Sequence, residues 1–278
     1  MSVEVSKEEG DDRETGAARE IQGFWRRREE EALLERARET LKDLPKDATL
    51  RESACLRVLA DLANIRALFL KAQALYFLGR FEEAIRAADE ALRGNEDPRA
   101  LLLRARAYCA LRQFQSATLD LTQLIDQSRG HKNPSSEEEK NARRKREDTK
   151  NAAHFLRGSL RSFTGDWQGA EHDFDAHLRG LADNERTSTK ARALESLAIA
   201  VAANDDYKRA LHLITDALVL DPNPAAMCLL ARLHCCERQW HLAEERYRDA
   251  LQLDPHFQGA IVGLHQATIA HEPMPLLG

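Results

Sequence analysis

The sequence lacks the features of membrane and secreted proteins. No stretch of eighteen apolar residues occurs anywhere in the 278 residues, so no membrane-spanning helix is predicted. The opening residues, MSVEVSKEE, contain no apolar core of signal-peptide length. The five cysteines are odd in number and fall in apolar helical contexts, which argues against a disulfide framework. We therefore expect a cytoplasmic protein, with the nucleus as a second location, and no membrane partner.

Motifs of catalysis and of cofactor binding are also absent. The sequence contains no glycine-rich phosphate loop, no nucleophile elbow and no paired-carboxylate signature. The acid pairs Glu82-Glu83 and Glu244-Glu245 fall at the starts of predicted helices, where negative charge is favoured by the positive end of the helix dipole. We expect no enzymatic activity and no cofactor.

Charge is distributed unevenly along the chain. The formal net charge is −5, and residues 1–20 hold seven acidic residues against three basic ones, which leaves about −1 for the remainder. A nearly neutral body has no general electrostatic footprint for nucleic acid, so nucleic acid is not expected as a partner. Residues 1–19 are acidic and without aromatic residues, and we predict that they form a disordered acidic tail.

Two segments near the C-terminus, residues 210–222 and 243–255, share the same landmarks in the same order. Both contain Asp-Ala-Leu followed by Leu-Asp-Pro, and each landmark recurs after 33 residues. Self-similarity at this period is typical of a solenoid of helical hairpins. Small alanines between bulky residues let two helices cross closely, and Asp-Pro ends the second helix because proline has no amide hydrogen to donate.

These two segments resemble the consensus of the tetratricopeptide repeat (TPR) family. The resemblance implies an all-α, right-handed α-solenoid of about five TPR helical hairpins with capping helices at both ends. The alanines that match the corner of each hairpin are separated by 33, 53, 40 and 33 residues, so two insertions interrupt the array. These corner alanines are Ala84, Ala117, Ala170, Ala210 and Ala243.

The repeats and their interruptions divide the chain into four parts. After the acidic tail, residues 20–64 are predicted to form an N-terminal helical cap or a degenerate repeat. Residues 65–257 form the TPR array, with a charged insertion at 127–150, and residues 258–278 form a C-terminal capping helix and tail. One hairpin cannot bury its apolar face alone, so the array needs these neighbours and caps.

By resemblance to other TPR arrays, the second, fifth, sixth, ninth and twelfth positions of the first helix of each hairpin line the inner surface. Apolar side chains mixed with a few arginines at these positions suit a protein or peptide segment with apolar anchors and some acid. We therefore predict a non-enzymatic protein–protein interaction adaptor. Its candidate binding residues are Arg66, Phe69, Gln73, Tyr76, Arg99, Arg106, Arg192, Glu195 and Arg232.

Two alternative functions stay open. TPR co-chaperones hold the C-terminal carboxylate of heat-shock chaperones with lysines, asparagines and an arginine at fixed inner positions, and here only Arg192 lands on a basic site of that template. A co-chaperone would therefore need a non-standard clamp, and the His-Pro-Asp triplet of J-domains is absent. The other alternative is a structural scaffold subunit of a larger complex, which makes its contacts through the outer helices.

A run of four bases lies within the charged insertion: Arg143, Arg144, Lys145 and Arg146. Such a run is typical of a nuclear localisation signal or of a small patch that binds polyanions. The competing interpretation is a charged extension of the next helix, with Glu139 and Arg143 in i, i+4 register.

Cysteines and histidines crowd one predicted hairpin but do not have the spacing of a metal site. Cys235 and Cys236 are adjacent, so their side chains point about 100° apart on a helix and form no CxxC pair. His172 and His177 are five residues apart, a poor spacing for shared coordination. We expect small cysteines to fill the core and we expect no metal.

Overall fold

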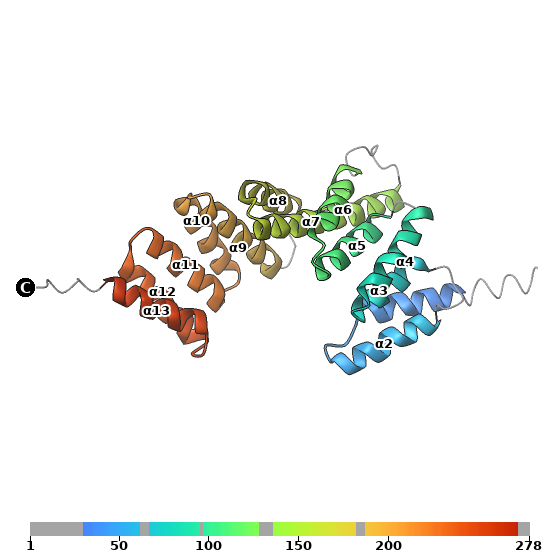
Figure 1. The fold of residues 1–278 in the computed structure, drawn as a ribbon, viewed down its shortest axis with the longest axis horizontal. Coiled ribbons are helices and arrows are strands. Elements are labelled where there is room, and N and C mark those ends of the chain that lie inside the picture. The colour runs from blue at the N-terminus through green and yellow to red at the C-terminus, as the bar shows by residue number, and fades with distance from the viewer. Residues whose placement is uncertain (1–29, 62–66, 95–96, 128–135, 182–186, 272–278) are drawn as a thin grey trace, which may run out of the picture. The chain divides into compact units, whose positions relative to one another are not determined.

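The computed structural model describes residues 30–61, 67–94, 97–127, 136–181 and 187–271 (Figure 1). Within these ranges all regular structure is helical, and thirteen helices pack in sequential pairs, which confirms the predicted all-α solenoid of hairpins. The predicted acidic tail and Arg66 lie outside the described residues. Two compact units divide the chain, Met1–Ala117 and Thr118–Gly278, and each is described by itself.

In the first unit, a helix over residues 30–42 precedes four labelled helices. This helix forms a shared core with α2 and α3, and the core contains Leu41, Cys55, Val58 and Leu70. The labelled helices are α2 (Ala48–Asp61), α3 (Leu68–Phe77), α4 (Phe81–Gly94) and α5 (Pro98–Ala110). Helix α4 packs against both α3 and α5, as the second helix of a hairpin does in a solenoid.

The second unit follows the same sequential pattern after α6 (Phe114–Gln127), which crosses the boundary between the units. Three hairpins follow, α7 with α8, α9 with α10 and α11 with α12, and each packs on the next through α8 with α9, α10 with α11 and α12 with α13. The bounds are α7 (Glu137–Thr164), α8 (Trp167–Gly180), α9 (Thr187–Ala203), α10 (Tyr207–Leu220), α11 (Pro224–Cys236), α12 (Trp240–Leu253) and α13 (Gln258–His271).

Every hairpin turns through one residue with a positive φ. These corner residues are spaced like the corner alanines and precede them by five positions: Gly79, Arg112, Gly165, Asp205 and Arg238. At each corner the next amide donates to the carbonyl five residues earlier, for example from Asp166 to Arg161 at 2.9 Å and from Gln239 to His234 at 2.8 Å. This is the six-to-one hydrogen bond of a Schellman cap, so all five corners share one geometry.

The corner alanines are buried inside their hairpins. All five are at most 1% exposed, because each sits where the two helices of its hairpin cross. In the third hairpin, Gly158 has the matching role in the first helix, since a Cβ there would lie 3.0 Å from the buried ring of Phe174. The prediction that small residues mark the crossings is therefore confirmed.

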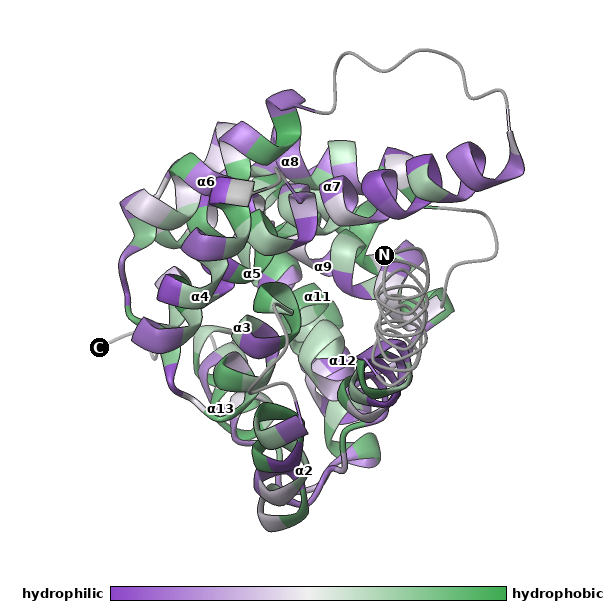
Figure 2. Cartoon of the chain, turned by 90° about the vertical axis from the view of Figure 1, so that its right-hand side faces the viewer, coloured by the Kyte–Doolittle hydropathy of each residue, from purple (hydrophilic) through white to green (hydrophobic). Residues whose placement is uncertain are grey.

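Helix α7 is twice as long as a typical first helix of this array, with 28 residues. It begins with a capping box, in which the Ser136 side chain accepts from the Glu139 amide and the Glu139 carboxylate accepts from the Ser136 amide. Residues 137–148 are all exposed, and Figure 2 shows their hydrophilic colouring along the start of α7. Packing against the hairpin partner begins only after this charged stretch.

Helix α13 closes the second unit by packing on α11 and α12. Gly263 lies against the ring of Tyr247, and a Cβ at this glycine would lie less than 3.0 Å from three ring and hydroxyl atoms. Tyr247 itself is only 3% exposed. Burial raises the pKa of Tyr247 to about 12, so the hydroxyl is neutral at physiological pH.

Replacing Gly263 by alanine should loosen α13. Overpacking of this kind costs about 1–3 kcal/mol, which outweighs the gain of up to about 1 kcal/mol that alanine brings to a helix. Chemical denaturation should therefore show a lower free energy of unfolding for Gly263→Ala. The exposed Gln266→Ala on the same helix should stay within about 0.5 kcal/mol of the wild type. Equal stability of the two variants would contradict the close packing at Tyr247.

Candidate functional site

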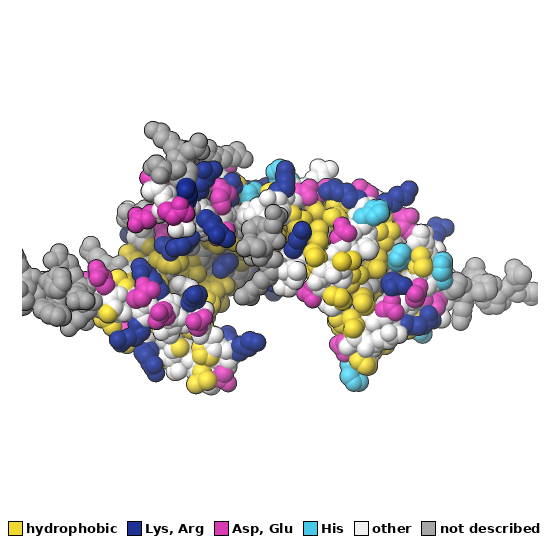
Figure 3. All heavy atoms as spheres, turned by 180° about the vertical axis from the view of Figure 1, so that it is seen from behind, with side chains coloured by type: hydrophobic (Ala, Val, Ile, Leu, Met, Phe, Trp, Pro, Cys, Tyr) yellow, Lys and Arg dark blue, Asp and Glu magenta, His cyan; other side chains and the backbone are white. Residues whose placement is uncertain are grey.

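The exposed sides of α9 and α11 form the candidate binding surface of the second unit, called here the first-helix surface. On α9 the residues that face the core recur at helical spacing, and they leave Arg192, Glu195 and Ile199 on the opposite side. On α11 the corresponding side carries Arg232, which is exposed. Figure 3 shows a band of hydrophobic side chains on this unit, at the right of the view, bordered by basic ones.

Arg192 sits beside an aromatic ring rather than an acid. Its guanidinium carbon lies 5.9 Å from the ring centroid of Phe155 on α7, which is within reach of a cation–π contact. Phe155 is in turn held by Phe174 and His177, at centroid distances of 5.6 and 5.1 Å. The ring is therefore a fixed, half-buried apolar element next to an exposed positive charge.

Glu195, the acid on this surface, is engaged elsewhere. Its Oε1 accepts a hydrogen bond of 2.8 Å from Nδ2 of Asn223, and the Asn223 side chain caps α11 by accepting from the Ala226 amide at 2.8 Å. Neither Arg192 nor Arg232 forms an ion pair with any carboxylate in the part of the chain that the structure describes. The surface thus carries two guanidinium groups whose charge is not matched locally.

In the first unit, several predicted residues already have partners within the chain. The Arg99 guanidinium lies 4.9 Å from the ring centroid of Phe69 and donates to Asp97, at 2.7 Å for the shortest contact. Tyr76 makes edge contacts with Phe77 and Phe81, at centroid distances of 5.8 and 5.6 Å. These interactions explain the positions of three predicted residues by intramolecular packing.

The two other predicted binding residues of the first unit differ in their exposure. Gln73 is half-buried on α3, whereas Arg106 on α5 is exposed. Arg106 has no ion pair among the described residues, as in the case of Arg192 and Arg232. Of the four predicted arginines that the structure describes, Arg99 is therefore paired locally with an acid, whereas Arg106, Arg192 and Arg232 have no ion pair among the described residues.

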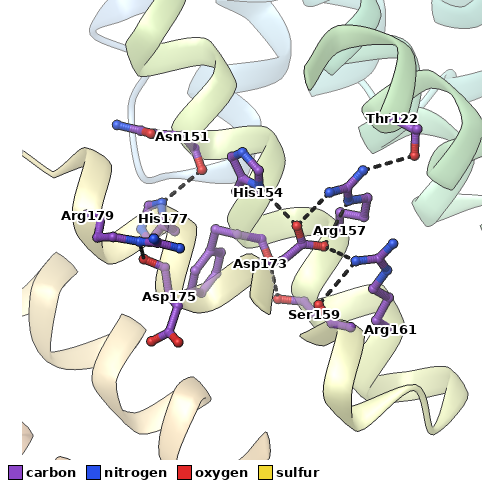
Figure 4. A network of polar contacts seen from close by, with 12 residues as sticks. Thr122, Asn151, His154, Arg157, Ser159, Arg161, Asp173, Asp175, His177 and Arg179 are labelled. Carbon is purple, nitrogen blue, oxygen red and sulfur yellow. Dashed lines mark hydrogen bonds and ion pairs between the residues drawn. The ribbon is translucent and has the colours of Figure 1, made fainter. Parts of the chain in front are cut away.

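A buried ionic cluster in the third hairpin was not predicted from the sequence (Figure 4). Asp173 on α8 is fully buried and accepts from Arg157 with both oxygens, at 2.8 and 2.7 Å. Arg161 reaches the same carboxylate at 2.8 Å, and Nδ1 of His154 lies 3.0 Å from it. Arg157 also donates to the Thr122 hydroxyl at 3.1 Å. The cluster links α6, α7 and α8 within the second unit.

The neighbours of Asp173 keep it ionised. Burial alone would raise the pKa of this carboxyl, but hydrogen bonds from His154 and Arg157 and the charges of Arg157 and Arg161 outweigh burial and lower it. A carboxyl whose pKa is lower in the folded state than in the unfolded state stabilises the fold at pH values above its unfolded pKa of about 3.9. This stabilisation is lost as the pH falls through the pKa of the folded state. The ionic cluster therefore stabilises the folded hairpin at neutral pH.

A comparison between repeats gives the signal that could have revealed this cluster. Counted back from the small residue of the first helix, His154 and Arg157 take the places of Leu194 and Leu197 in the next repeat. Two polar residues at positions that hold leucine in the following repeat indicate a buried network, because buried polar groups are almost always hydrogen-bonded.

Removing the charge of Asp173 should strongly destabilise the protein. Asp173→Asn leaves Arg157 and Arg161 without their carboxylate, and breaking a buried ion pair in this way costs about 3–5 kcal/mol. Asp175→Asn on the same helix removes only the partly exposed pair with Arg209, for which less than about 1 kcal/mol is expected. Urea denaturation of both variants checks the difference. Similar losses of unfolding free energy in the two variants would show that the buried cluster does not stabilise the hairpin.

The histidines and cysteines singled out in the sequence do not converge. His177 is buried and its Nδ1 lies 2.8 Å from the Asn151 carbonyl oxygen, whereas His172 is exposed. Cys228 is buried and Cys236 is exposed. In the described ranges no three His, Cys, Asp or Glu residues come together in a way that could hold a metal ion.

The four-residue basic run lies on the exposed first part of α7. All of Arg143, Arg144, Lys145 and Arg146 are exposed, and none forms an ion pair with a described acid. Neighbouring pairs within the helix join Lys140 to Glu137 at 3.0 Å and Lys150 to Glu147 at 3.7 Å. The structure thus places the run on a charged extension of the following helix, which was the competing interpretation.

None of the helices in the described ranges has both the length and the apolar character needed to cross a membrane. The longest, α7, is rich in charge over its first half.

No protein-family model matches the sequence, and no curated protein matches it. Solved structures do resemble the fold. MamA (residues 41 to its end) from Desulfovibrio magneticus RS-1 superposes with a TM-score of 0.55 at 17% identity, covering 70% of this chain and 98% of that chain. YrrB, described as a TPR protein with an unusual peptide-binding site, has a TM-score of 0.56 at 14% identity, with coverages of 76% and 97%. The apo form of RapI has 0.59 at 11% identity, with 75% and 61%.

At these identities the similarity concerns the fold. The architecture is a solenoid of helical hairpins with identical corners, as described above. YrrB is described as a TPR protein, and the described part of this chain has the same kind of fold, an all-α solenoid of helical hairpins.

Proposed function

We propose that the protein is a non-enzymatic adaptor that binds a protein segment on the first helices of its hairpins. The observation that carries this proposal is the pair of exposed, unpaired guanidinium groups of Arg192 and Arg232 on consecutive first helices. The half-buried Phe155 on α7, next to Arg192, and the 46% exposed Ile199 on α9 supply apolar contact. A partner with an acidic group and an aliphatic or aromatic anchor fits this combination.

The energetic roles of the two kinds of contact differ. Burial of apolar area provides most of the affinity, at about 25 cal/mol per Å² of surface removed from water. Charge complementarity accelerates encounter and orients the partner. Arginine also suits both roles, because its planar group can bind a carboxylate with two hydrogen bonds and can pack on a ring, as Arg192 packs near Phe155. The peptide-binding site described for YrrB, a protein of similar fold, agrees with a peptide-binding role here.

Charge reversal at the first-helix surface should abolish partner capture. Arg192→Glu combined with Arg232→Glu replaces attraction of an acidic partner by repulsion, and a loss of at least about tenfold in retained partner is expected, equivalent to about 1.4 kcal/mol. The measurement is affinity capture with quantitative mass spectrometry from the native cell type. Arg179→Glu with Lys208→Glu is the matched control, because it makes the same change in charge on the exposed second helices α8 and α10.

Other outcomes of the same experiment identify the alternatives. If the control variant loses the partners and the first-helix variant keeps them, the protein is a structural scaffold subunit that uses its outer helices. Micromolar binding of a synthetic peptide ending in Glu-Glu-Val-Asp would make it a co-chaperone with a non-standard clamp. In either case the adaptor hypothesis for the first-helix surface is rejected.

The basic run on α7 retains a second proposed role in nuclear localisation. Its exposure on the first part of α7, ahead of the first buried residue of this helix, favours access by a receptor. A fluorescent reporter fused to residues 127–150 should then accumulate in the nucleus, and replacement of Arg143, Arg144, Lys145 and Arg146 by alanine should return it to the cytoplasm. Equal distribution of both fusions leaves the run as a solvated helix surface.

A further inference from the structure

Two first helices of the chain present an arginine to an aromatic ring in the same way but differ in how the arginine is paired. On α5, the guanidinium carbon of Arg99 lies 4.9 Å from the ring centroid of Phe69. On α9, that of Arg192 lies 5.9 Å from the ring centroid of Phe155. The Arg99 guanidinium also donates to both carboxylate oxygens of Asp97, the N-cap of α5, whereas Arg192 forms no ion pair with a described acid.

Glu195 is the acid that Arg192 would be expected to bind. It is the one acidic residue within four positions of Arg192 in the sequence, and residues three apart lie on the same side of a helix. The same order and spacing forms an ion pair inside α12, where Nη1 of Arg246 lies 2.7 Å from Oδ2 of Asp249. A pair between Arg192 and Glu195 would compensate the guanidinium charge and compete with an acidic partner.

Asn223 binds Glu195 instead. Its Nδ2 donates to Oε1 of Glu195 at 2.8 Å and to the Asp221 carbonyl oxygen at 3.2 Å. Its Oδ1 accepts from the Ala226 amide at 2.8 Å and thereby caps α11. An asparagine side chain accepts at one end and donates at the other, so the cap turns the NH₂ group toward Glu195. The ionised aspartate at the equivalent cap of α5 has no hydrogen to donate, and it binds an arginine.

We propose that Asn223 is a positioning residue of the first-helix surface: by binding Glu195, it keeps the Arg192 guanidinium available to an acidic partner. This inference rests on the proposed function, because the free charge matters for binding only if the surface takes up an acidic segment. Asn223 acts through Glu195 and does not itself need to touch the partner. The residue at a helix cap thus decides whether the adjacent surface attracts acids, since Asp97 takes up Arg99 and Asn223 leaves Arg192 open.

Asn223→Ser tests the proposal without a change in net charge. Serine caps a helix about as well as asparagine, but its side chain is too short to keep the bond to Glu195. Glu195 should then turn to Arg192 and shift the Nε–Hε resonance of this arginine in the NMR spectrum of the isotope-labelled full chain. Arg192→Lys assigns the resonance. Adding Glu195→Gln to Asn223→Ser should return the resonance to its position in Glu195→Gln alone, because glutamine carries no charge.

Asn204→Ser is the matched control. It breaks the same kind of bond, from Nδ2 of Asn204 to Oε2 of Glu171 at 3.0 Å, just past the end of α9 that lies opposite Arg192. The Arg192 resonance should stay at its wild-type position in this variant. Circular dichroism confirms that each variant is folded.

Partner capture gives the functional readout, on the proteins whose retention Arg192→Glu with Arg232→Glu abolishes. Their retention should fall about two- to fivefold for Asn223→Ser, which is the range expected for one exposed ion pair. It should return to at least the wild-type level when Glu195→Gln is added. A cap residue with a merely structural role would not give this rescue.

Two NMR results would overturn the proposal: an Arg192 resonance that does not move in Asn223→Ser, or a shift that persists after Glu195→Gln is added, since the effect would then not pass through Glu195. Unchanged capture by folded Asn223→Ser would also overturn it, if the charge-reversal variant loses the partners. If the charge-reversal variant keeps them, the proposed function fails, and the Arg192 resonance still decides by itself whether Asn223 controls the pairing.

Discussion

The close crossing of two helices at each hairpin corner is the constraint on which the structure depends. One residue with positive φ and one buried alanine five positions later recur in all five hairpins. The left-handed residue lets the chain reverse within a few residues while the last carbonyls of the first helix are still hydrogen-bonded. The alanine lets the second helix return against the first, and larger side chains around the crossing then interlock. The corners fix how the two helices of each hairpin are oriented, and this orientation decides which side of each helix is exposed.

This constraint explains why the fold could be predicted from the sequence. It also explains why the left-handed conformation of some corner residues could not be predicted. The corner alanines recur with the period of the repeat, so Ala210 and Ala243 reveal the hairpins directly. The left-handed position tolerates more than glycine, and Arg112, Asp205 and Arg238 adopt it with φ values near 60°. Because the surrounding cap enforces the turn, nothing in the identity of those residues marks it. Aspartate occurs in the left-handed conformation more often than most residues other than glycine, but an arginine in the sequence does not indicate this conformation.

Side-chain partners are harder to predict because they depend on which positions meet across a hairpin. Asp173 and its partners Arg157 and His154 are separated by 16 and 19 residues, and a sequence rich in charge gives each of them many alternative partners. The exposure of Arg192 and Arg232 could be predicted from the helical template, because it depends only on position within one helix. Their lack of an acidic partner could not, since Glu195 lies nearby in sequence but is turned toward Asn223.

The unpaired charge on the first-helix surface bears on what that surface could bind. Charge at Arg192 and Arg232 is readily solvated, so leaving it unpaired costs the free protein little and gives selectivity for an acidic partner.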